Sequence, residues 1–161
     1  MYKLLEGKKI IVTGGTSGIG KAIASIFVRE GAIVVILGTN KEKAIAAVKD
    51  IEGENPDSSS CNYLIVDVAD ASAVESALKE QIQEWGNHID ILVNCAGITS
   101  DKLLIRMTEE DWSRVVAVNL DSLFRVTKSV LPTMMKSRSG KIINIASVIG
   151  CLLYTSPSPR D

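Results

Sequence analysis

Short apolar runs alternate along this chain with longer stretches in which apolar residues recur at helical spacing, and this alternation limits the possible folds. The runs predict strands at residues 9–13, 32–37, 62–66, 89–93 and 141–145, and the longer stretches predict helices at 18–30, 41–51, 71–85 and about 108–137. Strands that are apolar on both faces need cover on both faces, which favours a parallel sheet between two helical layers. Right-handed crossovers then predict a doubly wound α/β sheet.

Composition excludes several classes of protein. A length of 161 residues fits one domain, and 46% hydrophobic with 23% charged residues is typical of a globular chain, not a disordered one. The net charge of −1 provides no general attraction for nucleic acid or an anionic membrane. The apolar runs are too short to span a bilayer and no signal segment opens the chain. We therefore expect a cytoplasmic protein with no nucleic-acid or membrane partner.

The cysteine and histidine content argues against a disulfide framework and a metal site. The three cysteines, Cys61, Cys95 and Cys151, are scattered without C-x-x-C spacing, and His88 is the single histidine. An odd, scattered set suits free thiols in a reducing compartment. We expect no bound metal.

The strongest local signal is the glycine-rich segment that joins the first predicted strand to the first predicted helix. Glycines there allow a tight turn and close approach of the backbone to a pyrophosphate, while the helix N-terminus supplies free N–H donors. The alternative is a turn kept only for helix–strand packing. The candidate cofactor-binding residues are Gly14, Thr16, Ser17, Gly18, Ile19 and Gly20.

The end of the second strand bears on which dinucleotide would bind. A site for NAD usually places an acid here to bond the ribose 2′-hydroxyl, but no acid occurs before Glu42. Thr39 and Asn40, with Lys41 or Lys43, suit a 2′-phosphate instead. This favours NADP(H) over NAD, the alternative being solvated residues at the start of a helix.

Polar and small residues also follow the third and fourth strands, at the sheet edge where this architecture binds ligands. Asp67, followed by Val68, offers a carboxylate to an adenine amino group, or serves as a helix cap or turn residue, or both. Asn94, Ala96 and Gly97 close the fourth strand with side chains small enough to let a ligand approach the backbone.

Two further polar residues predict a reaction site. Ser147 ends the fifth strand on the same edge, and Asn119 interrupts an apolar helix face, where a polar group is costly unless it is hydrogen-bonded. Taken alone, each of these residues more often has a structural role than a catalytic one. As a pair on one edge they suggest catalysis.

These motifs together resemble the classical short-chain dehydrogenases/reductases. Residues 13–20 are similar to that family's TGxxxGxG element and residues 94–97 to its NAG element. The combination of residues 94–107, Asp111-Trp112, 118–120 and 134–150 narrows the resemblance to 3-oxoacyl-[acyl-carrier-protein] reductases, over about residues 5–150.

The resemblance implies a Rossmann-fold homotetramer that reduces a carrier-bound 3-oxoacyl thioester with NADPH in fatty acid biosynthesis. In such enzymes a serine orients the substrate carbonyl and a helix asparagine supports the proton relay, roles that match Ser147 and Asn119. A tyrosine donates the proton, and a lysine four residues later holds the nicotinamide ribose and lowers the tyrosine pKa. An arginine implicated in carrier-protein docking matches Arg138, whose alternative is a cation completing a helix C-terminus.

The chain departs from the family pattern at its proton donor. It contains no Tyr-x-x-x-Lys, Tyr154 lies too close to Ser147 to substitute, and Ser17 replaces an arginine common in NADPH-dependent members. We therefore expect little or no turnover from the chain as written. The alternatives are a non-catalytic NADP(H)-binding or interaction protein, and a reductase of another carbonyl compound.

The last segment differs in kind from the rest. We expect residues 1–150 to be the N-terminal part of one dinucleotide-binding domain, incomplete on its C-terminal side. Residues 151–161 contain Pro157 and Pro159, which exclude a regular helix, and we interpret them as a non-native tail. The alternative is a truncated paralogue.

Overall fold

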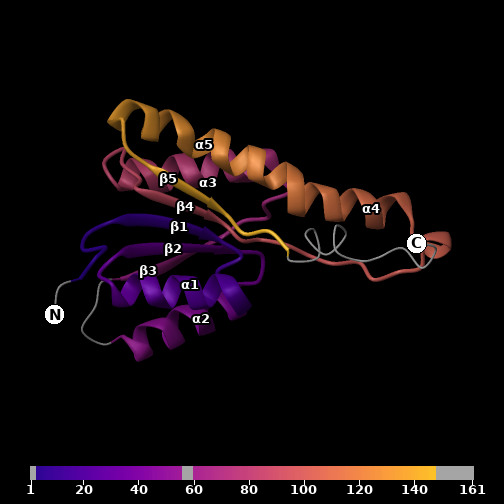
Figure 1. The fold of residues 1–161 in the computed structure, drawn as a ribbon, viewed down its shortest axis with the longest axis horizontal. Coiled ribbons are helices and arrows are strands. Elements are labelled where there is room, and N and C mark those ends of the chain that lie inside the picture. The colour runs from indigo at the N-terminus through magenta and orange to yellow at the C-terminus, as the bar shows by residue number, and fades with distance from the viewer. Residues whose placement is uncertain (1–2, 56–59, 148–161) are drawn as a thin grey trace, which may run out of the picture.

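In the computed structural model, which describes residues 3–55 and 60–147, the strands form one parallel five-stranded sheet (Figure 1). The strands are β1 (Lys9–Thr13), β2 (Ile33–Gly38), β3 (Cys61–Ile65), β4 (Ile91–Asn94) and β5 (Lys141–Asn144). Their order across the sheet is β3-β2-β1-β4-β5. The order therefore reverses direction between β1 and β4, which is the topological switch point of a doubly wound sheet.

Helices cover both faces of this sheet, as the apolar strands require. Helices α1 (Gly18–Arg29) and α2 (Lys41–Glu54) lie on one face, and α3 (Ala71–Glu84) and α5 (Ser122–Ser137) lie on the other (Figure 1). Side chains of the central strands alternate between the two layers. Ile10 and Val12 pack with the layer of α1 and α2, while Ile11 packs with that of α3 and α5. The predicted Rossmann-type architecture is confirmed.

The predicted elements recur with their ends moved by at most two or three residues, a scatter typical of element ends. The largest change in a single helix is at α2, which continues to Glu54, three residues past the expected end at Ile51. The side-chain amide of Asn55 donates to the Ile51 carbonyl at 2.7 Å and satisfies the end of the helix. The expected tail at residues 151–161 lies outside the described residues.

The long helical region predicted at 108–137 is helical from Glu109 to Ser137, and it consists of three consecutive segments. Helix α4 (Glu109–Val116) is followed by a π-helix, η2 (Ala117–Asp121), and then by α5. A capping box opens α4, with Thr108 as the N-cap and Asp111 as its partner. A 3₁₀ helix, η1 (Leu104–Arg106), precedes α4.

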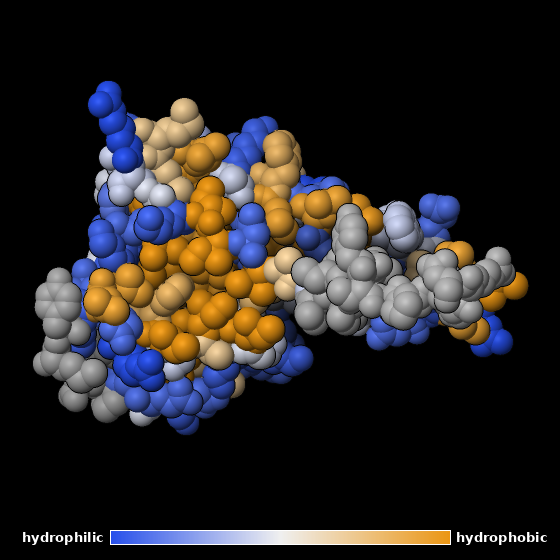
Figure 2. Space-filling view, in the orientation of Figure 1, coloured by the Kyte–Doolittle hydropathy of each residue, from blue (hydrophilic) through white to orange (hydrophobic). Residues whose placement is uncertain are grey.

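Strand β5 is exposed on one side of the sheet. Among the described residues it pairs only with β4, and Ile142, Ile143 and Ile145 are each more than a third exposed. Ile23, Phe27 and Ile143 line an apolar hollow of about 180 Å³ between α1 and this edge, within the broad apolar area that Figure 2 shows. Within residues 3–55 and 60–147, the outer edge of β5 therefore has no strand paired to it. No helix in the described part of the chain has the length and apolar character needed to cross a membrane.

At the amino ends of the strands, a buried carboxylate joins β1 to the segment before β4. The side chain of Asp90 accepts hydrogen bonds from the Lys8 ammonium and the Lys9 backbone N–H, both at 2.9 Å, and His88 Nε2 lies 3.2 Å away. Burial alone raises the pKa of Asp90, but the hydrogen bonds from Lys9, Lys8 and His88 outweigh it and hold the pKa below its ordinary value.

We predict that Asp90→Asn lowers the free energy of unfolding at pH 7 by about 1–3 kcal/mol, because an amide cannot accept the same charge-assisted bonds. Since the folded pKa of Asp90 is depressed, its contribution is present above pH ~4 and is lost as the pH falls through the folded value. Urea unfolding at pH 7 and pH 3 measures both effects. The control is Asp50→Asn, whose exposed pair with Lys21 contributes at most about 1 kcal/mol. Equal losses in the two variants would contradict the prediction.

Candidate functional site

The glycine-rich turn after β1 packs directly against the segment after β4. Gly14 has a φ of +67°, and a Cβ atom there would lie 2.8 Å from the Ala96 Cα atom. A Cβ atom at Gly20, on the first turn of α1, would collide with the Gly14 carbonyl oxygen. Real side chains do not tolerate such contacts, so the sequence needs glycine at both positions. The resulting cradle is made of backbone and is open above the strand ends.

The Thr13 side chain holds the turn after β1 against the segment after β4. Its side chain is buried, and its Oγ1 atom accepts hydrogen bonds from the backbone N–H groups of Cys95 and Ala96, both at 3.0 Å. One hydroxyl thus ties the end of β1 to the end of β4 across the switch point. In the sequence Thr13 is recognisable only as the first residue of the motif, because its contact with residues 82 and 83 positions away has no local signature.

A groove of about 420 Å³ opens at this edge of the sheet. It brings together the predicted residues of the first three loops with those that follow β4, as expected from the parallel order of the strands. The predicted residues that line it are Gly14, Thr16, Ser17, Gly18, Ile19, Gly20, Thr39, Asp67, Val68, Ala96 and Gly97. The groove is also lined by Cys95, Ile98, Arg114, Val118 and Ile145, among others.

Helix α1 points its N-terminus into the groove without a side-chain cap. Ser17, at the N-cap position, makes no capping hydrogen bond, whereas Asn40, Asp70 and Thr108 each cap their own helices in the described structure. The first N–H groups of α1 and the positive end of its dipole are therefore available to an anion. A pyrophosphate fits these donors and the glycine cradle beside them.

Two predicted cofactor-binding residues do not line the groove. The Asn40 side chain accepts a hydrogen bond from the Lys43 N–H at 2.8 Å, and so it caps α2. Asn94 is buried, and its amide donates to Asn144 Oδ1 at 2.8 Å and to Thr127 Oγ1 at 3.4 Å. Asn94 thus joins β4 to β5 and α5 beneath the groove.

Asp67 is held by a turn and by a cation that the sequence did not reveal. One carboxylate oxygen accepts the Ala69 N–H at 2.9 Å, and the other accepts Arg114 Nη2 of α4 at 2.8 Å. Burial raises the pKa of Asp67, but the bond from Ala69 and the nearby guanidinium outweigh it and hold the pKa below its usual value. The carboxylate is therefore charged at neutral pH, and Arg114 lines the groove beside it.

Asn119 reaches the far wall of the groove. Its Oδ1 atom accepts the Ile98 N–H at 2.8 Å, and its Nδ2 atom donates to the Ile98 carbonyl at 2.9 Å. The expected hydrogen bonding of this polar residue is therefore present. Ser147 is exposed and lies three residues past the end of β5, beyond the same edge of the sheet.

Arg138 lies at the opposite edge from the groove. It is the C-cap of α5, with a φ of +51° in the left-handed region, and its N–H donates to the Met135 carbonyl at 3.1 Å. The structure thus places Arg138 at the C-terminus of α5, where the alternative interpretation expects a cation.

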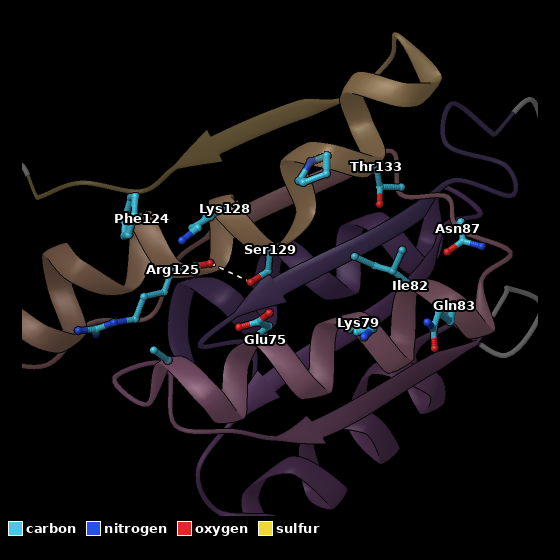
Figure 3. Close-up of a pocket in the computed structure, with 12 residues that line it drawn as sticks. Glu75, Lys79, Ile82, Gln83, Asn87, Phe124, Arg125, Lys128, Ser129 and Thr133 are labelled. Atoms are coloured by element: carbon cyan, nitrogen blue, oxygen red, sulfur yellow. Dashed lines mark hydrogen bonds between the residues drawn. The ribbon is translucent and has the colours of Figure 1, made fainter.

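A second hollow, of about 450 Å³, lies between α3 and α5 (Figure 3). It is lined by charges of both signs, including Glu75, Lys79 and Lys128, and by apolar groups such as Ile82. None of the predicted site residues lines it, and it lies in the helical layer rather than at the strand ends. The groove at the switch point is therefore the candidate site. Among the described residues, no three His, Cys, Asp or Glu side chains gather as a metal site would require.

Comparison with known proteins agrees with this geometry. The family model described as short chain dehydrogenase matches residues 8–158. The 3-oxoacyl-[acyl-carrier-protein] reductase FabG of Thermotoga maritima is 42% identical over 157 residues, covering 98% of this chain and 61% of that protein. The reductase of the same name from Escherichia coli is 43% identical over 147 residues, covering 91% and 57%. The chain thus spans about 60% of the length of these curated relatives.

Solved structures with the same fold include both kinds of nucleotide complex. A metagenomic short-chain oxidoreductase in complex with NADP superposes with a TM-score of 0.83 at 30% identity, covering 91% of this chain and 64% of that one. An NAD⁺-bound xylitol dehydrogenase superposes with a TM-score of 0.84 at 28% identity, covering 92% and 56%.

We predict that Thr13→Val, which keeps the shape but removes the hydroxyl, lowers the free energy of unfolding by about 1–3 kcal/mol, because two partly buried N–H groups lose their acceptor. Urea titration measures this loss. Thr13→Ser keeps the acceptor and is expected to restore most of it. The matched control, Thr127→Val, removes an acceptor of one long bond. A loss at Thr13 no larger than that at Thr127 would contradict the prediction.

Proposed function

Because the chain belongs to the short chain dehydrogenase family, we propose that the groove at its switch point binds NADP(H) for the reduction of a carbonyl substrate. The observation that carries this proposal is the uncapped N-terminus of α1 beside the glycine cradle of Gly14 and Gly20. The bound nucleotide supplies the hydride, and the chain supplies the pyrophosphate donors and the groove walls.

The substrate that we propose is a 3-oxoacyl thioester on acyl carrier protein, with the 3-hydroxyacyl thioester of fatty acid biosynthesis as product. The names of the relatives from Thermotoga maritima, Vibrio cholerae and Escherichia coli support it, at 42–45% identity. In this proposal Ser147 orients the substrate carbonyl and Asn119 supports the proton relay. Arg138 contributes to docking of the acidic carrier protein, in addition to ending α5.

The preference for NADP(H) over NAD(H) rests on the end of β2. Thr39 lines the groove, and the first acid after it is Glu42, so no carboxylate repels a 2′-phosphate there. Lys41 and Lys43, at the start of α2, add positive charge nearby. Asn40 is committed to capping α2, which leaves Thr39 and the lysines to meet the phosphate.

We predict that Thr39→Asp weakens NADPH binding about tenfold and strengthens NADH binding, since a carboxylate repels the 2′-phosphate and accepts the 2′-hydroxyl of NADH. Nucleotide fluorescence titration gives both dissociation constants. Thr39→Asn is the control, because asparagine has the shape of aspartate without its charge. This variant is expected to keep the preference for NADPH over NADH. A wild-type chain that binds NADH more tightly than NADPH would contradict the proposed cofactor.

Turnover is a separate question from binding. These 161 residues contain no Tyr-x-x-x-Lys, so we propose that the chain alone binds the nucleotide but reduces 3-oxoacyl thioesters little or not at all. Loss of NADPH absorbance in the presence of a 3-oxoacyl thioester tests this. A rate near that of the relatives would contradict it. Size-exclusion chromatography distinguishes the second candidate, a non-catalytic NADP(H)-binding protein, which predicts a soluble oligomer of defined size. The N-terminal part of a reductase, with its exposed β5 edge, predicts self-association without a defined size.

We also propose cytoplasmic location and a homotetramer for the protein that reduces carrier-bound substrate. The outer face of α5 supports an oligomer, because Phe124, Leu131 and Met135 are exposed there beside Leu123. An apolar helix face of this kind is typically covered by another helix.

A further inference from the structure

The π-helix η2 displaces the backbone hydrogen bonds of the helix, and side chains of α5 bond two of its carbonyl groups. In a π-helix the hydrogen bond spans five residues instead of four, and a backbone N–H at the C-terminal cap of η2 donates to the Ala117 carbonyl. The regular pattern of donors is thereby displaced by one residue. A side-chain donor that also bonds a carbonyl of the wide turn stabilises that register.

Two side chains of α5 provide such donors. The buried Ser122 hydroxyl donates to the Val118 carbonyl at 2.6 Å. Arg125 Nη1 donates to the Ala117 carbonyl at 3.2 Å, and its other terminal nitrogen lies 3.3 Å from an Asp121 carboxylate oxygen. Figure 3 shows the Arg125 side chain extending away from Ser129, back toward the start of the helix.

The register of η2 decides where Asn119 points. Asn119 lies in the middle of η2, and both polar atoms of its side chain bond the backbone of Ile98. A regular α-helix turns by about 100° per residue, so removing the extra residue of the wide turn would rotate Asn119 off this contact. Ile98 and Gly97 line the nucleotide groove, and Gly97 faces the Asn119 side chain.

We propose that Ser122 and Arg125 are positioning residues that hold η2 in its π register, so that Asn119 fixes the groove wall at Gly97 and Ile98. Neither residue lines the groove in this structure; both act through Asn119. The proposal concerns the same groove as the proposed function, and its effect on nucleotide affinity rests on that function. The predicted effect of these residues on the contact between Asn119 and Ile98 does not rest on the proposed function.

The test compares Ser122→Ala with a matched control in the same helix. Ser129 makes the same kind of bond, from its hydroxyl to the Arg125 carbonyl four residues earlier at 3.0 Å, but outside η2 (Figure 3). We expect Ser122→Ala to speed hydrogen exchange of the Ile98 amide about tenfold and to weaken NADPH binding about five- to tenfold. Ser129→Ala is expected to change both by less than twofold.

A double-mutant cycle separates positioning from general stability. If Ser122 acts through Asn119, then Ser122→Ala combined with Asn119→Ala behaves like Asn119→Ala alone in both measurements. Additive losses, or an unchanged Ile98 amide in Ser122→Ala, would overturn the proposal. Arg125→Met gives a second route if Ser122→Ala does not fold: faster exchange at Ile98 supports the proposal and an unchanged rate overturns it.

The two readouts distinguish this inference from the proposed function. If the wild-type chain does not bind NADPH while the Ile98 amide still responds to Ser122→Ala, the proposed function fails and the positioning role stands. If NADPH binds and the Ile98 amide does not respond, the positioning role fails and the proposed function stands.

Discussion

The close approach of two backbone segments at the switch point is the constraint on which the site depends. The turn after β1 and the segment after β4 are tied by the Thr13 hydroxyl, and Gly14 packs against Ala96 with no room for a side chain. Because β1 lies between β2 and β4, this contact places the N-terminus of α1 over the point where the strand order reverses. The anion donors and the groove follow from that placement.

Contacts that stabilise the fold lie at one edge of the sheet, and the candidate site lies at the other. At the amino edge, Asp90 bonds Lys8 and Lys9, and Arg138 ends α5. At the carboxyl edge, polar groups face a groove, and the first turn of α1 has no side-chain cap. The parallel sheet imposes this division, because all its strands run in the same direction. The loops that follow strands therefore lie at one edge of the sheet, and the loops that precede strands lie at the other.

Most of the fold followed from the sequence because its signals are local. Apolar runs such as β1 and periodic stretches such as α3 carry their own patterns, and parallel pairing follows from two-sided burial. The glycine-rich turn was likewise predictable as part of the groove, because glycine permits backbone conformations that other residues rarely adopt.

The contacts that sequence reasoning missed join residues far apart or depend on local register. Arg114 meets Asp67 across 47 positions, and no pattern in either segment announces the pair. The side chains of Asn40 and Asn94 turn to a helix cap and to the strand β5, because backbone and amide partners lie within reach there. The π-helix around Asn119 needs one extra residue in a turn, which helical periodicity over 108–137 does not resolve.

The central claim is that the groove at the switch point holds a dinucleotide, and amide chemical-shift mapping tests it most directly. Titration of the isotopically labelled chain with NADPH is predicted to shift the amides of Gly14, Gly18, Thr39 and Ala96. The same titration is predicted to leave Asp90, at the opposite edge, unchanged. Saturable shifts confined to the amino edge or to the hollow between α3 and α5, with no change in the amide shifts of the glycine-rich turn, would contradict this claim.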